Sequence, residues 1–423
     1  MDDGWVRLVL ESVVDREPPL GSVVNDSLRA GVKLRRRRRA QGVAGSAAVV
    51  AVVAVVAVAI PKMPPQNSAA SRTAPGRTAY VANIGADTIT PISTANGTPG
   101  RPIKLDNYPV SIAITPDGKT AYVPCLLNAV VPITTATNKP GRPIRIEGSP
   151  QTIVITPDGK TAYVLTRGTG DRTHDSTVVP ITTATGKPGR PIRIGPSSQA
   201  FPAQDMAITP DGKTVYVLRG GHPGTVVPIA TATNTAGNPI RVGRSPEDIA
   251  ITPDGKTAYV ASGDDPGLVT PIATATNTAG NPIRVGRSPQ FIAITPDGKT
   301  AYVASGDDPG LVTPIATATN TAGNPIRVGR SPQFIAITPD GKTAYVANYD
   351  SGTVTPVVTA TNTAERPVNV GLHPWTIAIT PDGRTIYVDS DKTNKVTPIA
   401  TATNKAGNPI KVGTEPYSIV FVP

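Results

Sequence analysis

The side chains that most often carry catalysis or bind metals are scarce in this chain of 423 residues. It has one cysteine, Cys125, and three histidines, His174, His222 and His373. A single cysteine excludes an intramolecular disulfide and any zinc or iron–sulfur site that needs several thiolates. The sequence also lacks a GxSxG nucleophile elbow, an HExxH zinc motif, a phosphate-binding P-loop and a dinucleotide-binding glycine pattern. We therefore predict no metal and no cofactor, and we assign no catalytic residue.

One irregular stretch is the place where a hydrolytic site could still lie. The residues RGTGDRTHDS (167–176), and a second insertion around residues 196–203, interrupt an otherwise regular pattern. They bring carboxylates, an arginine and a histidine into one part of the chain, and these side chains can perform general acid–base catalysis. The candidate residues of this alternative are Asp171, Arg172, His174, Asp175 and Asp205.

A second set of side chains is suited to binding. Arginines and aromatic residues recur at or just before the start of one of the predicted strands, at positions that vary among the copies of a repeated unit. Aromatic rings surrounded by arginines and carboxylates make a reasonable binding surface. The candidate ligand-binding residues are Arg244, Arg287, Phe291, Arg330, Phe334, Trp375 and Tyr417.

The elements that position these residues are short strands. Proline (46) and glycine (40) together exceed a fifth of the chain, and charged residues make up 17%. This composition argues against a helical bundle or a coiled coil. From Arg77 onward the sequence repeats with a period near 43 residues, which is typical of propellers and solenoids. Each unit contains four apolar stretches separated by turns, and in one copy these stretches are FIAIT, TAYVAN, GTVTPV and ERPVNVG.

The turn TPDG, or a close variant, occurs seven times and predicts a hairpin between the first and second strands. Proline sets φ at the first turn position, aspartate caps the local backbone, and glycine adopts the positive φ. Prolines in the third and fourth stretches place those strands near an outer edge, whereas IAIT has no proline and suits the buried innermost strand. One tyrosine recurs in the second strand of every copy and is predicted to be a core residue. These tyrosines are Tyr80, Tyr122, Tyr163, Tyr216, Tyr259, Tyr302, Tyr345 and Tyr387.

The two ends of the repeat array predict a closed ring. The array opens at Arg77 with a second strand, and it finishes with a first strand, residues 416–422. The last strand can therefore complete the sheet that begins at Arg77, which leaves only short, protected edges. We predict an all-β propeller of four-stranded antiparallel blades over residues 77–423. It has eight blades, one of them closed by a 3+1 sharing of strands, or seven as the alternative.

The unit AYVAN, followed by VTP, RVG and IAITPDG, resembles the YVTN-family β-propeller repeat. The resemblance covers roughly residues 77–423, although this chain has Ala or Ser where the family name has Thr. It implies a bacterial or archaeal extracytoplasmic propeller, often at the cell surface. Some related propellers are lactonases or cofactor-bound oxidoreductases, so the resemblance makes the hydrolytic alternative a lactonase-like one. None of those activities belongs to the repeat itself.

The first 76 residues are predicted to anchor and tether the propeller. Val43 to Ile60 is an uncharged apolar run that would span ~27 Å as a helix, close to the ~30 Å hydrocarbon core of a bilayer. Five consecutive arginines, residues 35–39, precede it and favour a cytoplasmic amino terminus. We predict a cytoplasmic basic tail (1–42), a single-pass transmembrane signal anchor (43–60), a flexible linker (61–76) and an extracytoplasmic propeller (77–423). A cleaved signal peptide is the alternative, because Ala57-Val58-Ala59 resembles a cleavage site.

Charge and repetition favour a binding role. Residues 43–423 carry 32 basic and 24 acidic side chains, so their net charge is +8, which suits anionic wall polymers or acidic proteins. Nucleic acid is disfavoured because the arginines have no aromatic stacking platform beside them. Residues 256–298 and 299–341 are identical, and a ring that accepts an added blade suits a repeated binding surface better than a single catalytic centre. We predict a membrane-anchored binding or scaffold module for an extracytoplasmic protein or envelope polymer, with a lactonase-like hydrolase as the alternative and the oligomeric state left open.

Overall fold

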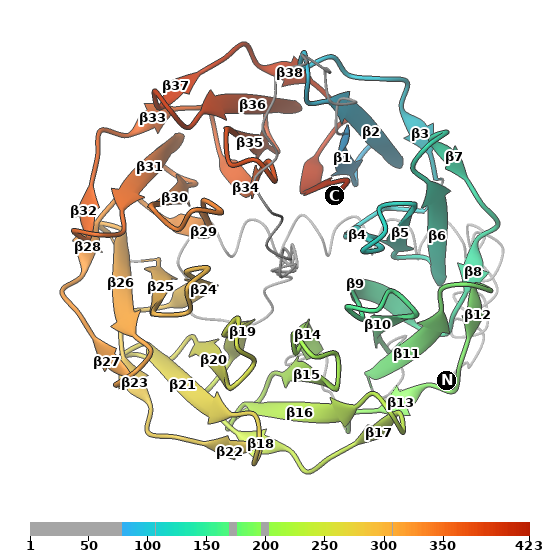
Figure 1. Ribbon diagram of the computed structural model, residues 1–423, viewed down its shortest axis with the longest axis horizontal. Coiled ribbons are helices and arrows are strands. Elements are labelled where there is room, and N and C mark those ends of the chain that lie inside the picture. The colour runs from blue at the N-terminus through green and yellow to red at the C-terminus, as the bar shows by residue number, and fades with distance from the viewer. Residues whose placement is uncertain (1–77, 106, 169–175, 196–202, 307) are drawn as a thin grey trace, which may run out of the picture. The chain divides into compact units, whose positions relative to one another are not determined.

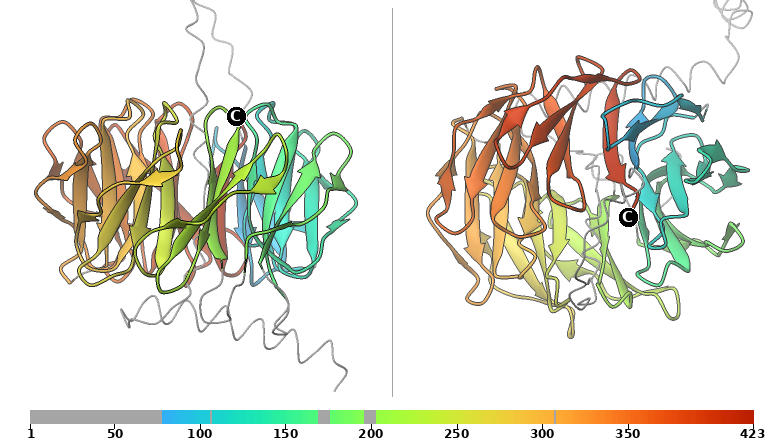
Figure 2. Two further views of the ribbon diagram at one scale, coloured as in Figure 1. Left: turned by 90° about the horizontal axis from the view of Figure 1, so that it is seen from below. Right: turned by 45° about the horizontal axis from the view of Figure 1, so that its top comes forward.

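A computed structural model describes residues 78–423 except 106, 169–175, 196–202 and 307. These residues form eight small antiparallel sheets arranged in a ring, which is an eight-bladed β-propeller (Figures 1 and 2). The predicted all-β fold and its eight blades are therefore confirmed. Within the described part of the chain no helix is long and apolar enough to cross a membrane. The predicted tail, anchor and linker lie outside the described residues.

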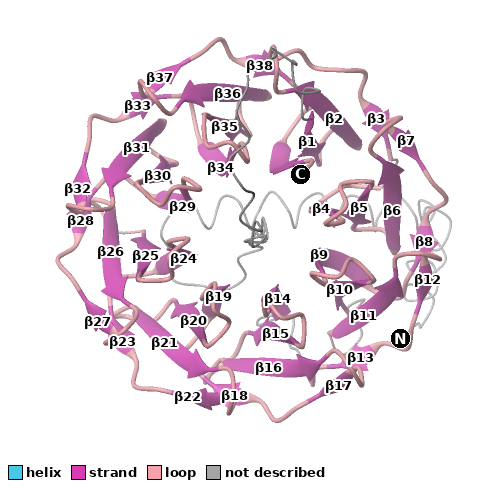
Figure 3. Cartoon of the chain, viewed as in Figure 1, coloured by secondary structure: helices cyan, strands magenta, loops and turns pink. Residues whose placement is uncertain are grey.

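Each blade has the same strand order from the ring axis outward, and the described connections between these strands are loops and turns (Figure 3). The innermost strands of blades 1 to 8 are β39 (Pro416–Phe421), β4 (Ala113–Ile114), β9 (Ser149–Ile155), β14 (Ala203–Ile208), β19 (Pro246–Ile251), β24 (Pro289–Ile294), β29 (Pro332–Ile337) and β34 (Pro374–Ile379). The second strands are β1 (Thr78–Asn83), β5 (Thr120–Cys125), β10 (Thr161–Arg167), β15 (Thr214–Arg219), β20 (Thr257–Ser262), β25 (Thr300–Ser305), β30 (Thr343–Asn348) and β35 (Thr385–Ser390).

The outward half of each blade follows the same plan. The third strands are β2 (Thr88–Ser93), β6 (Ala129–Thr134), β11 (Thr177–Thr182), β16 (Thr225–Ala230), β21 (Leu268–Ala273), β26 (Leu311–Ala316), β31 (Thr353–Val358) and β36 (Lys395–Ala400). The outer strand is β3 (Ile103–Lys104) in blade 1 and two short segments in each of the others. These segments are β7 (Lys139–Pro140) and β8 (Ile144–Arg145), β12 (Lys187–Pro188) and β13 (Ile192–Arg193), β17 (Thr235–Ala236) and β18 (Ile240–Arg241), β22 (Thr278–Ala279) and β23 (Ile283–Arg284), β27 (Thr321–Ala322) and β28 (Ile326–Arg327), β32 (Thr363–Ala364) and β33 (Val368–Asn369), and β37 (Lys405–Ala406) and β38 (Ile410–Lys411).

The repeated proline of the third strand explains why the outer strand is interrupted. In blade 6, β26 pairs with β27 and with β28 but not at the point between them, where Pro314 lies. Proline has no backbone N–H to donate to a neighbouring strand. Its carbonyl oxygen still accepts a hydrogen bond from the Gly323 N–H at 2.7 Å. The prolines therefore do mark the outer part of the blade, as predicted.

The ring closes through blade 1, which contains the last strand of the chain. Strand β39 pairs antiparallel with β1, so that Ile419 lies opposite Val81 and Phe421 opposite Ala79. Ile419 is completely buried. The predicted sharing of one blade between the two ends of the repeat array is confirmed.

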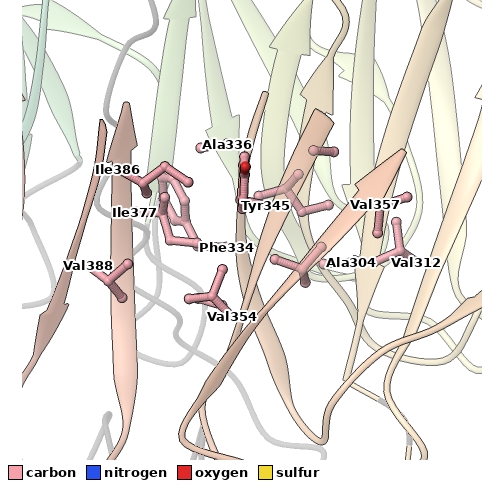
Figure 4. Packing of buried hydrophobic residues seen from close by; sticks show 14 of the residues in the cluster. Ala304, Val312, Phe334, Ala336, Tyr345, Val354, Val357, Ile377, Ile386 and Val388 are labelled. Carbon is pink, nitrogen blue, oxygen red and sulfur yellow. The ribbon is translucent and has the colours of Figure 1, made fainter. Parts of the chain in front are cut away.

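The core lies between neighbouring blades, because both faces of every sheet are covered. Figure 4 shows one such layer, in which Phe334 and Tyr345 of blade 7 pack near Ile377 and Ile386 of blade 8. In the innermost strands the isoleucine that follows the variable positions is buried, whereas the next alanine is partly exposed in several blades. The innermost strand is therefore not fully covered, since its free edge faces the ring axis.

The TPDG hairpins confirm the predicted role of their aspartates. In blade 2 the Thr115 hydroxyl donates to Asp117 Oδ1 at 2.6 Å and the Lys119 N–H donates to the same oxygen at 3.1 Å. These hydrogen bonds, above all the one from Thr115, hold the pKa of Asp117 below its ordinary value. Gly118 has a φ of 70°, which glycine adopts without steric cost.

At six of the eight junctions between blades, a tyrosine of one blade forms a hydrogen bond with an asparagine of the next blade. The Tyr302 hydroxyl of blade 6, for example, donates to Asn362 Oδ1 of blade 7 at 2.6 Å. The asparagine occupies the turn between the third and outer strands, where all six have φ between 52° and 55°. Asparagine tolerates this left-handed conformation and brings an acceptor oxygen to the neighbouring blade. The six pairs are Tyr80–Asn138, Tyr163–Asn234, Tyr216–Asn277, Tyr259–Asn320, Tyr302–Asn362 and Tyr345–Asn404.

Glycine replaces this asparagine at two junctions, and one of them is the junction between blades 8 and 1. Gly97 has a φ of 69°, and a Cβ placed on it would lie 3.5 Å from Ile410 Cδ1, an ordinary contact distance. We expect Gly97→Asn to give the Tyr387 hydroxyl an amide acceptor and to stabilise the ring by about 1 kcal/mol. Denaturant unfolding measures the change. Gly97→Ala, which adds a Cβ without an acceptor, should instead destabilise, and an equal gain for both variants would contradict the hydrogen bond as the cause.

Candidate functional site

The ring has two distinct faces. The turn face carries the TPDG hairpins, the asparagine turns and the position where the chain enters at Thr78, whose carbonyl accepts a hydrogen bond from the Val422 N–H at 2.9 Å. The loop face carries the loops between second and third strands together with the loops that precede the innermost strands. Hydrogen bonds join these two sets of loops, for example Gly263 N–H to Ser245 O at 3.0 Å and Tyr349 N–H to Ser331 O at 2.9 Å. The two sets of loops therefore share one face, which lies opposite the point at which the chain enters.

The three candidate arginines are exposed on the loop face. Arg287 Nε lies 3.4 Å from Asp265 Oδ1 of the preceding blade, and both side chains are more than 70% exposed, so this pair is weakly stabilising. The Arg244 and Arg330 backbone N–H groups donate to Asp264 Oδ2 and to Ser351 Oγ, at 2.8 and 2.7 Å. Loop side chains therefore fix the backbone of these arginines, while the guanidinium groups remain accessible.

The two candidate phenylalanines lie inside the protein. Phe291 and Phe334 are 8% and 7% exposed, and their ring centroids are 3.9 Å apart across the junction of blades 6 and 7. Both belong to the hydrophobic cluster that fills this part of the ring. The structure thus corrects their expected placement on an accessible surface, because the third position of the innermost strand points toward the neighbouring blade. Their aromatic rings pack in the core between blades. A mutational test of binding by the loop face therefore needs other residues.

Trp375 and Tyr417 belong to an aromatic row that crosses blades 7, 8 and 1. Tyr417 stacks on Trp375 at a centroid distance of 6.1 Å, and Trp375 meets Tyr349 edge-on at 5.9 Å. His373 stacks on Tyr349 at 4.3 Å. The rings of Tyr349, Trp375 and Tyr417 are buried, so the row forms a rigid support beneath the loops.

Leu372 stands directly before His373 and is the exposed residue at this aromatic row. It is 64% exposed and is the one large hydrophobic side chain classed as exposed in the described part of the chain. At the equivalent position blades 5, 6 and 7 have Arg244, Arg287 and Arg330, and blade 1 has Thr414. The sequence contained this signal as a leucine in place of arginine, but the prediction did not include it.

Buried polar side chains at the loop-face end of the innermost strands connect neighbouring blades. Asp248 accepts hydrogen bonds from the Ile249 N–H at 2.9 Å and from the Ile292 N–H of the next blade at 2.7 Å. The Thr376 hydroxyl donates to the Tyr417 carbonyl oxygen at 3.1 Å. The sequence signal for these contacts is a polar residue within an apolar strand. The sequence analysis did not identify the contacts, because each partner lies in the next blade.

The residues of the hydrolytic alternative can be placed only in part. Asp205 is completely buried at the position equivalent to Asp248, and its Oδ1 accepts a hydrogen bond from the Met206 N–H at 2.6 Å. The other four candidates, Asp171, Arg172, His174 and Asp175, lie outside the described residues. Among the residues that are described, no group of three His, Cys, Asp or Glu side chains is arranged to hold a metal.

Comparisons with known proteins agree on the architecture. The family model "Lactonase, 7-bladed beta-propeller" matches residues 272–397, less than a third of the chain. A chain of the Kuenenia stuttgartiensis hydrazine synthase is 22% identical with a TM-score of 0.55, and the match covers 70% of this chain and 96% of that one. The chain is a β-propeller.

Two further solved propellers show the same fold at lower identity. Dihydro-heme d1 dehydrogenase NirN, in complex with DHE, is 13% identical with a TM-score of 0.68, and the match covers 85% of this chain and 77% of that one. AztD from Citrobacter koseri is 12% identical with a TM-score of 0.59, and the match covers 82% of this chain and 98% of that one. A search of curated proteins found no match. At these identities the likeness concerns the fold, and the eight blades of this ring differ from the seven of the matching family.

Proposed function

We propose that this chain is a membrane-anchored, extracytoplasmic propeller of the YVTN type that acts as a binding or scaffold module. Its partner would be an extracytoplasmic protein or a component of the cell envelope. The repeat AYVAN with VTP and RVG supports the YVTN assignment, and the apolar run from Val43 to Ile60 supports a single-pass anchor. The proposed site is the loop face, which carries the exposed Arg244, Arg287 and Arg330 on blades 5, 6 and 7 and Leu372 on blade 8.

The observation that carries the proposal is the exposure of Leu372. An isolated exposed leucine needs no explanation on most proteins. Here it lies next to an aromatic row that Trp375 and Tyr417 extend, on the face opposite the chain entry. A rigid, buried aromatic layer beneath an apolar contact and a rim of arginines resembles the centre and rim of a protein interface.

The repeated polar residues offer no comparable site. Tyrosines and their asparagine partners form hydrogen bonds between blades, and the TPDG aspartates accept hydrogen bonds within their own turns. The loops, where the copies differ in sequence, therefore remain as the candidate binding site.

The expected result of Leu372→Arg is loss of envelope binding with the fold intact, because arginine occupies the equivalent position in blades 5, 6 and 7. The full chain in detergent is incubated with the envelope fraction and sedimented at high salt, where exposed charges are screened. Asn369→Arg is the matched control, since it adds the same charge three residues earlier on the outer strand, where other blades also have arginine. We expect this control to bind like the parent. Equal retention of all three proteins would show that the site lies elsewhere.

A lactonase-like hydrolase is the second candidate, and the family match favours it. The matched residues 272–397 exclude Asp205 and the irregular segment of blade 3, so the match concerns the repeats. Turnover of a lactone panel by the full chain, abolished by Asp205→Asn in a folded variant, would replace the binding proposal.

A further inference from the structure

The outer surface of the ring is strongly basic. We define the outer wall as the third strand and outer segments of each blade with their connections. It comprises residues 88–105, 129–146, 177–194, 225–242, 268–285, 311–328, 353–370 and 395–412. These residues include 15 lysines and arginines and one acidic residue, Glu365. The remainder of residues 43–423 has 17 basic and 23 acidic residues, so the modest total of +8 conceals a basic wall and acidic faces.

All 15 of these basic side chains are exposed, and none makes an ion pair with another described residue. The lysines of the turn face differ in this respect. Lys342, for example, lies 3.5 Å from Asp340 of the same turn, and five other turns repeat this pair. Turn-face charges are thus balanced locally, whereas wall charges are not.

The wall charge is concentrated on one half of the ring. Blades 8, 1, 2 and 3 are consecutive around the ring (Figure 1) and carry 11 of the 15 basic residues with no acidic one. We call this half the basic arc. Blades 2 and 3 have the outer sequence KPGRPIR, at residues 139–145 and 187–193, where blades 5 and 6 have TAGNPIR. Because β8 of blade 2 lies beside β12 of blade 3, Arg145 and Lys187 extend one continuous basic surface across the junction.

A groove lies within this arc, at the junction where the ring closes. It has a volume of about 530 Å³ and is lined from blade 8 by Tyr387, Asn408 and Lys411 and from blade 1 by Asn96 and Gly97. Gly97 is the position that lacks the asparagine side chain found at six junctions. The arc therefore combines a row of cations with a recess that offers amide groups and an ammonium group.

We propose that the basic arc binds a linear phosphate polymer. Arginine forks engage two phosphate oxygens at once, and Arg142, Arg145, Arg190 and Arg193 supply four of them on adjacent blades. The outer wall contains no aromatic residue, and Tyr387 in the groove is only 2% exposed, so the arc has no accessible ring on which nucleic-acid bases could stack. A phosphate polymer without bases fits this chemistry best. This surface is separate from the loop face, so either site can fail without the other.

The test uses a variant whose sequence the fold already accepts. Lys139→Thr, Arg142→Asn, Lys187→Thr and Arg190→Asn give blades 2 and 3 residues that blades 5 and 6 have at the equivalent positions. The control removes the same charge from the turn face through Lys213→Gln, Lys256→Gln, Lys299→Gln and Lys342→Gln. Binding of the full chain to poly(glycerol phosphate) is measured as a function of salt concentration.

We expect the wall variant to bind at least about tenfold more weakly and to lose about three units of slope in the plot of log K against log salt. The turn-face control should bind within about twofold of the parent, and so should Leu372→Arg, which separates this result from the loop-face site. Equal weakening of the wall and turn-face variants would show that total charge and not the arc is responsible. Absence of binding by the parent, or tighter binding of oligo(dT) or polyglutamate than of poly(glycerol phosphate), would overturn the proposal.

Discussion

Removal of residues 416–423 is expected to abolish cooperative folding of the ring. Strand β39 supplies the innermost strand of blade 1, and its Tyr417, Ile419 and Val420 are all buried. Burying one large apolar side chain contributes about 1.5–3 kcal/mol, so the three together approach the total stability of an ordinary domain. The free edge of β1 would also invite aggregation.

Thermal and denaturant unfolding of the truncated chain provide the measurement. Deletion of Pro423 alone is the control, because this residue follows the strand and is exposed. A peptide of residues 414–423 added in trans should restore part of the transition. A truncated chain that melts as cooperatively as the parent would show that blade 1 does not depend on β39.

Alkaline pH is expected to unfold the ring between about pH 10 and 12. Burial raises the pKa of Tyr80, Tyr216, Tyr302 and Tyr345 to about 12, from an ordinary value near 10. Since the folded pKa lies above the unfolded one, the contribution of these tyrosines is fully present below pH 10. It is lost as the pH rises through the folded pKa. A phenolate also cannot donate to the asparagine oxygen of the next blade.

Tyrosinate absorbance and circular dichroism, followed together through an alkaline titration, test this expectation. Ionisation of the junction tyrosines should coincide with loss of β structure in a cooperative step. Tyr302→Phe removes one such ionisation and should shift the transition. Full ionisation at pH 10 with the fold intact would contradict the proposed role of burial.

The sequence was sufficient to predict the propeller because every blade repeats the same local sequence features. TPDG specifies a hairpin, the third-strand proline specifies the outward half, and the unmatched strands at the two ends require closure. None of these inferences needs knowledge of contacts between distant residues.

The details that escaped prediction all depend on a neighbouring blade. Phe291 and Phe334 lie near the start of their strands, shortly after loops that contain an arginine, so their sequence positions suggested surface aromatics. They are buried because each innermost strand is covered on both faces by adjacent blades. Asn362 resembled a simple turn residue, yet its partner Tyr302 is 60 residues earlier in the chain. The net charge of +8 for residues 43–423 likewise did not reveal the basic wall, because a net charge does not show where the charged residues lie.

The tyrosine–asparagine bond gives the ring a direction, because at each of the six junctions that have it the tyrosine of one blade donates to the asparagine of the next blade. Tyr259 donates to Asn320 of the next blade, and Tyr302 donates in turn to Asn362. A contact of this head-to-tail kind closes only when the rotation per unit completes a circle, and otherwise it continues indefinitely. A fragment of several blades would therefore expose one donor side and one complementary acceptor side. Proteolytic pieces of this protein would tend to assemble end to end, either into a complete circle or into an open filament.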